Sequence, residues 1–132
     1  MEDGESVVID NGSYTCRAGF GGDDAPRSIF PPVVSSSASD SSLVGANYKD
    51  TYVGDEAQVR RDILYPKTPL FENGVVKNWD DMEKVWFHVF YDELRTEPEK
   101  HSVLISESPL NTSECRQRTA EVMFEKFGVP GF

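Results

Sequence analysis

A segment close to the amino terminus has the residue types of a phosphate-binding hairpin. Two β-prone runs flank Asn11-Gly12, and Asn-Gly is the strongest short hairpin signal because both residues tolerate positive φ. The free backbone N–H groups of such a turn, with the Ser13 hydroxyl, form a concavity suited to anionic oxygens. Arg17 adds a positive charge. The segment predicts a nucleotide phosphate site, although most Asn-Gly hairpins bind nothing.

A carboxylate lies where a metal ion bound to those phosphates would need one. Asp10 ends the first predicted strand, directly before the turn. Hard cations prefer carboxylate oxygen, and Mg²⁺ tends to keep several of its waters. We therefore expect Asp10 to contact a hydrated Mg²⁺ through water.

Length and charge exclude several classes of function. The 132 residues correspond to one domain or to a piece of a larger one, and the net charge of −10 at pH 7 argues against nucleic acid or an anionic membrane surface as partners. Cys16 and Cys115 are too few for a disulfide framework, so we expect reduced thiols. The acidic amino terminus lacks the apolar stretch of a signal peptide.

The order of predicted elements indicates an α/β fold. Three short strands up to about residue 30 suggest an antiparallel meander, and residues 35–42 form a serine run expected to be a mobile loop. A helix is predicted from about residue 79 to residue 94, where apolar residues recur at helical spacing after the cap residue Asn78. Residues 103–105 form an apolar run typical of a strand buried on both sides.

A second helix, from Thr112 or Ser113 to the stop signal at Gly128, completes the pattern. A strand between two helices favours a parallel crossover onto the existing sheet. We therefore expect a mixed sheet with packed helices, and one that is incomplete because the chain ends directly after a helix.

Several single residues have ordinary structural interpretations. Trp79 and Trp86 fall on the apolar positions of the first predicted helix and are expected to be core anchors. Cys16 is expected to pack on its strand. His88 and His101 are far apart in sequence, so we expect surface or half-buried positions rather than metal ligands.

The chain resembles the amino-terminal third of actin and actin-related proteins over nearly its whole length. The segments that carry the resemblance are Asp10-Asn11-Gly12-Ser13, Ala18-Gly19-Phe20, Gly22-Asp23-Asp24-Ala25-Pro26-Arg27, Tyr52-Val53-Gly54-Asp55-Glu56-Ala57-Gln58, Asn78-Trp79-Asp80-Asp81-Met82-Glu83-Lys84, Pro109-Leu110-Asn111 and Met123-Phe124-Glu125. The resemblance implies an actin-like fold of the RNase H-like, sugar kinase and Hsp70 superfamily. It further implies ATP or ADP with Mg²⁺ in a cleft between two halves.

The resemblance also implies roles for the first hairpin. Asp10 would face the hydrated metal, and Arg17 would supply charge to the phosphates where the family has lysine. Donors to the β- and γ-phosphates would come from Gly12, Ser13, Tyr14 and Thr15. Tyr14 departs from the family glycine and would crowd an approaching phosphate. Arginine keeps the positive charge of lysine but presents it on a planar guanidinium instead of a compact ammonium group, so the two residues are not interchangeable at position 17.

The resemblance divides the chain into two parts. Residues 1–32 and 70–132 would form a partial core subdomain that carries the phosphate hairpin, and residues 33–69 a small inserted subdomain with the serine-rich loop. In actins that loop inserts into the next subunit, and its loss of apolar residues here puts filament growth in doubt. Ser106 and Cys115 stand where the family usually has threonine and asparagine.

These expectations lead to two functions. The first is an actin-family cytoskeletal protein of the cytoplasm, which binds ATP and Mg²⁺ when intact and contacts actin-like subunits and actin-binding proteins. The second is a nucleotide-independent interaction module that binds actin partners without polymerising. Intact family members are weak ATPases, but the catalytic glutamine, the second phosphate loop and the adenosine pocket of the family lie beyond residue 132. A third possibility is a sugar kinase or Hsp70 relative, but nothing in the sequence outside the hairpin supports it.

Overall fold

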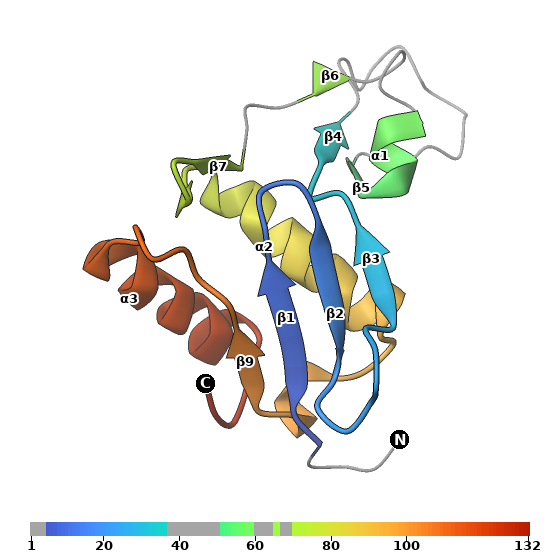
Figure 1. Ribbon diagram of the computed structural model, residues 1–132, viewed down its shortest axis with the longest axis vertical. Helices are drawn as coiled ribbons and strands as arrows, with labels where there is room; N and C mark the ends of the chain where they lie inside the picture. The colour runs from blue at the N-terminus through green and yellow to red at the C-terminus, as the bar shows by residue number, and fades with distance from the viewer. Residues whose placement is uncertain (1–4, 37–50, 60–64, 67–69) are drawn as a thin grey trace.

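A four-stranded mixed sheet forms the centre of the molecule, in the order β3-β2-β1-β9. Its strands are β1 Val7–Asn11, β2 Cys16–Phe20, β3 Ser28–Phe30 and β9 Val103–Ile105. The computed structural model describes residues 5–36, 51–59, 65–66 and 70–132. The first three strands are antiparallel, and β9 pairs with β1 in parallel (Figure 1). The predicted meander and crossover are both confirmed.

Two helices provide most of the remaining core. Helix α2 spans Trp79–Phe87 and continues as the π-helical segment η2 His88–Glu93, and it lies behind the sheet in Figure 1. Helix α3 spans Ser113–Glu121, continues as the π-helical segment η4 Val122–Lys126 and lies beside β9. A 3₁₀ turn, η3 Pro98–Lys100, precedes β9. The predicted helices are confirmed in type and position.

The buried face of α2 explains why this segment is helical. The apolar side chains of α2 and η2 recur at helical spacing and are fully buried: Met82, Val85, Trp86, Val89 and Phe90. At the amino end the Asn78 side chain accepts a hydrogen bond from the Asp81 N–H at 3.1 Å. That bond satisfies one of the donors that a helix start leaves free.

Smaller elements lie at one end of the central sheet (Figure 1). A second sheet has the order β5-β4-β6, with β4 Val34–Ser36, β5 Thr51–Val53 and β6 Tyr65–Pro66. Helix α1 Asp55–Val59 follows β5. A separate hairpin consists of β7 Phe71–Glu72 and β8 Val75–Val76. All strands of the second sheet come from the stretch assigned to the inserted subdomain, a division that stays a prediction.

The central sheet is covered on one face only. Val7, Ile9 and Val103 point to the helices and are buried, whereas Ile29 and Leu104 point the other way and are 58% and 65% exposed. The prediction that residues 103–105 are buried on both sides is therefore wrong. The alternation arises because successive side chains of a strand face opposite sides.

Two further expectations need correction. His101 is not at the surface but fully buried. Both ring nitrogens have partners there, which makes burial of this polar side chain possible: Nδ1 lies 2.6 Å from the Glu5 carbonyl oxygen, and Nε2 lies 2.7 Å from Thr96 Oγ1. The serine run does not begin as a loop, since Ser35 and Ser36 lie in β4. The rest of the run, residues 37–42, lies outside the described residues. Cys16 and Trp86 are buried as expected.

We predict that the cap of α2 is required for stability. Replacing Asn78 with alanine removes the oxygen that accepts from Asp81 and is expected to lower the free energy of unfolding by about 1 kcal/mol. Urea denaturation followed by circular dichroism measures this. Asn78→Ser is the control, because a serine oxygen still caps, and equal losses in the two variants would contradict a capping role.

Candidate phosphate site

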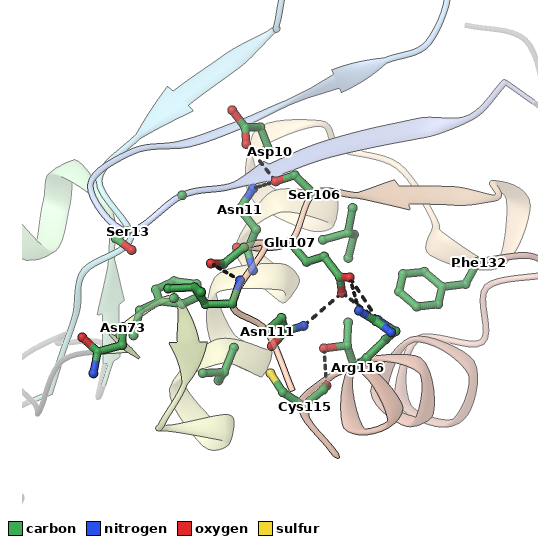
Figure 2. A pocket seen from close by; sticks show the side chains of 18 residues that line it. Asp10, Asn11, Ser13, Asn73, Ser106, Glu107, Asn111, Cys115, Arg116 and Phe132 are labelled. Carbon is green, nitrogen blue, oxygen red and sulfur yellow. Dashed lines mark hydrogen bonds and ion pairs between the residues drawn. The ribbon is translucent and has the colours of Figure 1, made fainter. Parts of the chain in front are cut away.

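A cavity of about 500 Å³ lies at the end of the central sheet. It is enclosed by the loop after β1, the β7–β8 hairpin and the connection from β9 to α3 (Figure 2). Asp10, Gly12 and Ser13 line it from the first side, Asn73 and Gly74 from the second, and Ser106, Glu107 and Asn111 from the third. Three segments that are distant in sequence thus meet at one polar hollow.

The loop between β1 and β2 is built differently from the predicted turn. Asn11 is still in β1 and pairs with Cys16, so the loop comprises the four residues 12–15. Neither Asn11 nor Gly12 has a positive φ. Glycine is needed at residue 12 for another reason, because a Cβ there would lie only 2.7 Å from the Thr15 carbonyl oxygen. The hairpin is confirmed, but its expected turn type is wrong.

A chain of hydrogen bonds joins the ends of β1 and β9. The Ser106 hydroxyl donates to Asp10 Oδ1 at 2.8 Å and accepts from the Asn11 N–H at 2.8 Å. Both bonds are drawn in Figure 2. They hold the carboxylate of Asp10 beside the cavity, and serine needs only its hydroxyl to do so. Ser106 is thus a site residue through its role in placing Asp10.

The second oxygen of Asp10 is paired with Arg17. Arg17 Nη1 lies 3.2 Å from Asp10 Oδ2, and both side chains are about half exposed. The two residues are direct cross-strand neighbours on the open face of the sheet. There they line a second depression of about 350 Å³, from which Ser13 and Gly12 are absent. The structure therefore brings Asp10, Gly12 and Ser13 together at the cavity and holds Arg17 on the adjacent face.

Besides Arg17, two more of the predicted site residues lie outside the lining of the cavity. Tyr14 is 91% exposed and extends from the tip of the loop, and Thr15 begins the return towards β2. Any contact that they make to a phosphate would be made by the loop on its solvent side. Their predicted role as donors stays a prediction.

The opposite wall contains a two-residue Asn-Gly turn, which the sequence analysis missed. Asn73 and Gly74 have φ values of 53° and 80° and connect β7 to β8. These are the positive φ values that Asn-Gly permits in a tight hairpin. A Cβ at residue 74 would collide with Ser108 Oγ, so the glycine also allows the turn to approach the third wall. The sequence did contain the signal for this turn, because the dipeptide Asn73-Gly74 lies between β-prone residues at position 71 and positions 75–76.

An ion pair braces the third wall, and it too was missed. The guanidinium of Arg116 binds both carboxylate oxygens of Glu107, with the shortest contact from Nη2 at 2.7 Å, and Asn111 Nδ2 donates to the same carboxylate at 3.0 Å (Figure 2). The hydrogen bonds from Arg116 and then Asn111 lower the pKa of Glu107. The pair ties the connection after β9 to the first turn of α3. The two residues are nine positions apart, a spacing that predicts no contact within a helix or a strand, so the sequence alone did not indicate the pair.

Two buried side-chain oxygens of cavity-lining residues lack a hydrogen-bond donor among the described residues. They are the side-chain oxygens of Asn11 and Asn111. Buried acceptors in native proteins are normally satisfied by protein or by ordered water. These two oxygens are out of reach of the cavity, but the Asp10 carboxylate lines it and is about half exposed, and a carboxylate suits the water ligands of a hydrated Mg²⁺. Asp10 thus fits the metal expected from the sequence.

The described residues contain no group of three or more histidine, cysteine, aspartate or glutamate side chains that could hold a metal ion. No helix in the described ranges is long and apolar enough to cross a membrane.

The fold is that of an α/β protein whose first hairpin lies beside a polar cavity at one end of a mixed sheet. The model of the actin family matches residues 1–132, the entire chain. The chain belongs to the actin family. The resemblance seen in the sequence is therefore confirmed, including the fold class.

The Glu107–Arg116 pair makes a pH-dependent prediction. The lowered pKa of Glu107 in the folded state means that its pairing stabilises the folded chain above the ordinary glutamate pKa, and that this contribution is lost as pH falls through the lowered value. Arg116→Gln is expected to raise the pKa of Glu107 towards its ordinary value, measured by NMR titration of the carboxyl carbon. Asn111→Ala should raise it less, and the reverse order would contradict the pairing.

Proposed function

We propose that this chain is an actin-family cytoskeletal protein that supplies one wall of a binding cleft for ATP or ADP with Mg²⁺. The observation that supports this most directly is the convergence of Asp10, Gly12 and Ser13 on one cavity. The family match over the whole chain supports the same ligand.

Each hairpin residue has a role in the proposed complex. The N–H groups of residues 12–15 and the Ser13 hydroxyl donate to phosphate oxygens, because a loop outside the β ladder has donors to spare. Asp10 orients a water ligand of the metal. Arg17 carries the positive charge for the phosphates, either through guanidinium donors other than the Nη1 that contacts Asp10 or by giving up that contact. Since exposed ion pairs contribute about 0–1 kcal/mol, loss of the contact would cost little.

The half-site binds but does not hydrolyse in this proposal. The carboxylates among the described residues that line the cavity are Asp10 and Glu107, and each is already bonded, to Ser106 and to Arg116, so neither is placed to activate a water. Tight nucleotide binding also needs convergent groups from both walls of a cleft. We assign the chain to the cytoplasmic cytoskeleton, with actin-like subunits and actin-binding proteins as partners.

One observation favours a second function. The open face of the central sheet exposes Ile29 and Leu104 around the Asp10–Arg17 pair, and exposed apolar side chains gathered on one face are typical of an interaction surface. A chain that uses this face without binding nucleotide would be a nucleotide-independent interaction module. Measurement of nucleotide affinity separates the two functions.

We predict that Mg·ATP stabilises the purified chain. Ligand present at about 100 times its dissociation constant adds about 2.7 kcal/mol to the free energy of unfolding, which appears as an upward shift of the melting temperature. Parallel melts with Mg²⁺ alone and with ATP plus a chelator separate the contributions of metal and nucleotide. A melting temperature unchanged by Mg·ATP would favour the interaction module.

We predict that Arg17→Gln weakens this binding about tenfold, because a hydrogen bond to a charged group contributes about 1.5–3 kcal/mol. Isothermal titration calorimetry measures the dissociation constant. Arg118→Gln is the matched control, since it removes the same charge from the exposed surface of α3, away from the cavity. Equal losses in both variants would indicate a general charge effect.

We predict that Tyr14→Gly strengthens Mg·ATP binding severalfold, because a glycine lets phosphate oxygens approach the loop backbone. Tyr14→Phe is the control: it keeps the ring and removes the hydroxyl, so its affinity should equal that of the parent chain. If glycine weakens binding while phenylalanine does not, the ring itself contacts the nucleotide and crowding is the wrong explanation.

A further inference from the structure

The chain contains two Asn-Gly dipeptides in contrasting surroundings, at residues 11–12 and 73–74. In this dipeptide the backbone nitrogen of the glycine reaches the side-chain carbonyl carbon of the asparagine with the least hindrance, because glycine has no Cβ. The same covalent reaction is therefore open in principle at both positions. The fold decides which of them reacts.

Asn73 is placed where the reaction is easiest. Its side chain is exposed, and it occupies the tip of a hairpin whose two strands have only two residues each. A short two-stranded hairpin is marginally stable by itself, so we expect its exposed tip to open more readily than the end of the four-stranded sheet. Opening lets the backbone at Asn73 rotate away from its left-handed conformation into the geometry of ring closure.

Asn11 is held against the same reaction. It is the last residue of β1, its N–H donates to Ser106 Oγ at 2.8 Å, and its side-chain oxygen is buried. Ring closure at Asn11 would require the central sheet to separate at its edge with the cavity.

We propose that Asn73 is a site of spontaneous deamidation, and that Asn11 is protected. The Gly74 nitrogen attacks Asn73 Cγ, a C–N bond forms, and the side-chain amide nitrogen leaves as ammonia with the proton from Gly74. Water then opens the five-membered succinimide at either carbonyl. The products are aspartate and isoaspartate, so the net reaction consumes one water and releases one ammonia without any change of oxidation state.

The modification adds charge to the site described above. Asn73 lines the cavity opposite Gly12 and Ser13, and a carboxyl group there is ionised at neutral pH. Its negative charge would repel a polyphosphate. This consequence, unlike the modification, rests on the proposed function: deamidation would lower the affinity of the half-site as the protein ages.

The test is a peptide map of the folded chain after incubation at mildly alkaline pH. We expect a mass gain of about one dalton at residue 73, as separate aspartate and isoaspartate peptides, accumulating at least severalfold faster than at residue 11. A parallel sample unfolded in urea should react at both positions at similar rates. Equal rates in the folded chain, faster reaction at Asn11, or no product at residue 73 would overturn the proposal.

Two variants extend the test. Asn73→Gln lengthens the side chain by one methylene, disfavours the five-membered ring and should show no product at residue 73. Asn73→Asp reproduces one product and is expected to bind Mg·ATP severalfold more weakly than the parent chain, whereas unchanged binding would remove the proposed consequence. If the parent chain itself binds no Mg·ATP, the proposed function fails, and the peptide map still decides the modification.

Discussion

The parallel pairing of β1 with β9 is the constraint on which the rest of the structure depends. It places Val7 opposite Val103 and Ile9 opposite Ile105, across almost a hundred residues of chain. Helix α2 lies in that crossover and must cover the sheet, which fixes its apolar face. The same pairing brings Ser106 to Asp10. Without it the hairpin would lack the walls that turn a loop into a cavity.

The polar bonds at the end of β1 show how an acidic chain pairs the carboxylates that lie beside the cavity. Asp10 is neutralised from one side by Arg17 and bonded from the other by Ser106. The charge on Glu107 is likewise matched by Arg116. The cavity is therefore less negative than the net charge of −10 suggests. Local pairing, rather than overall charge, determines whether phosphate oxygens can approach.

Local patterns predicted the elements well, and tertiary geometry decided the rest. The cap at Asn78 and the apolar spacing behind it define α2, because both signals act within one helix. Which of the two Asn-Gly dipeptides forms a tight turn depends on strand pairing and not on the dipeptide itself. Pairing of Asn11 with Cys16 keeps that asparagine in the strand, and the tight turn forms at Asn73. The Glu107–Arg116 pair and the burial of His101 similarly depend on segments that meet only after folding.

Asp10 links the two surfaces of the central sheet. Its carboxylate accepts from Ser106 at the cavity, yet its side chain lies on the open face beside Arg17 and in line with Val8. On that face Leu104 is the neighbour of Val8, and Ile29 that of Arg17. Whatever covers the exposed apolar side chains must therefore contact or displace the Asp10–Arg17 pair. Because Asp10 takes only one of the five N–H donors of the Arg17 guanidinium, at 3.2 Å, the proposed phosphate site and anything that covers this face would draw on the same side chain.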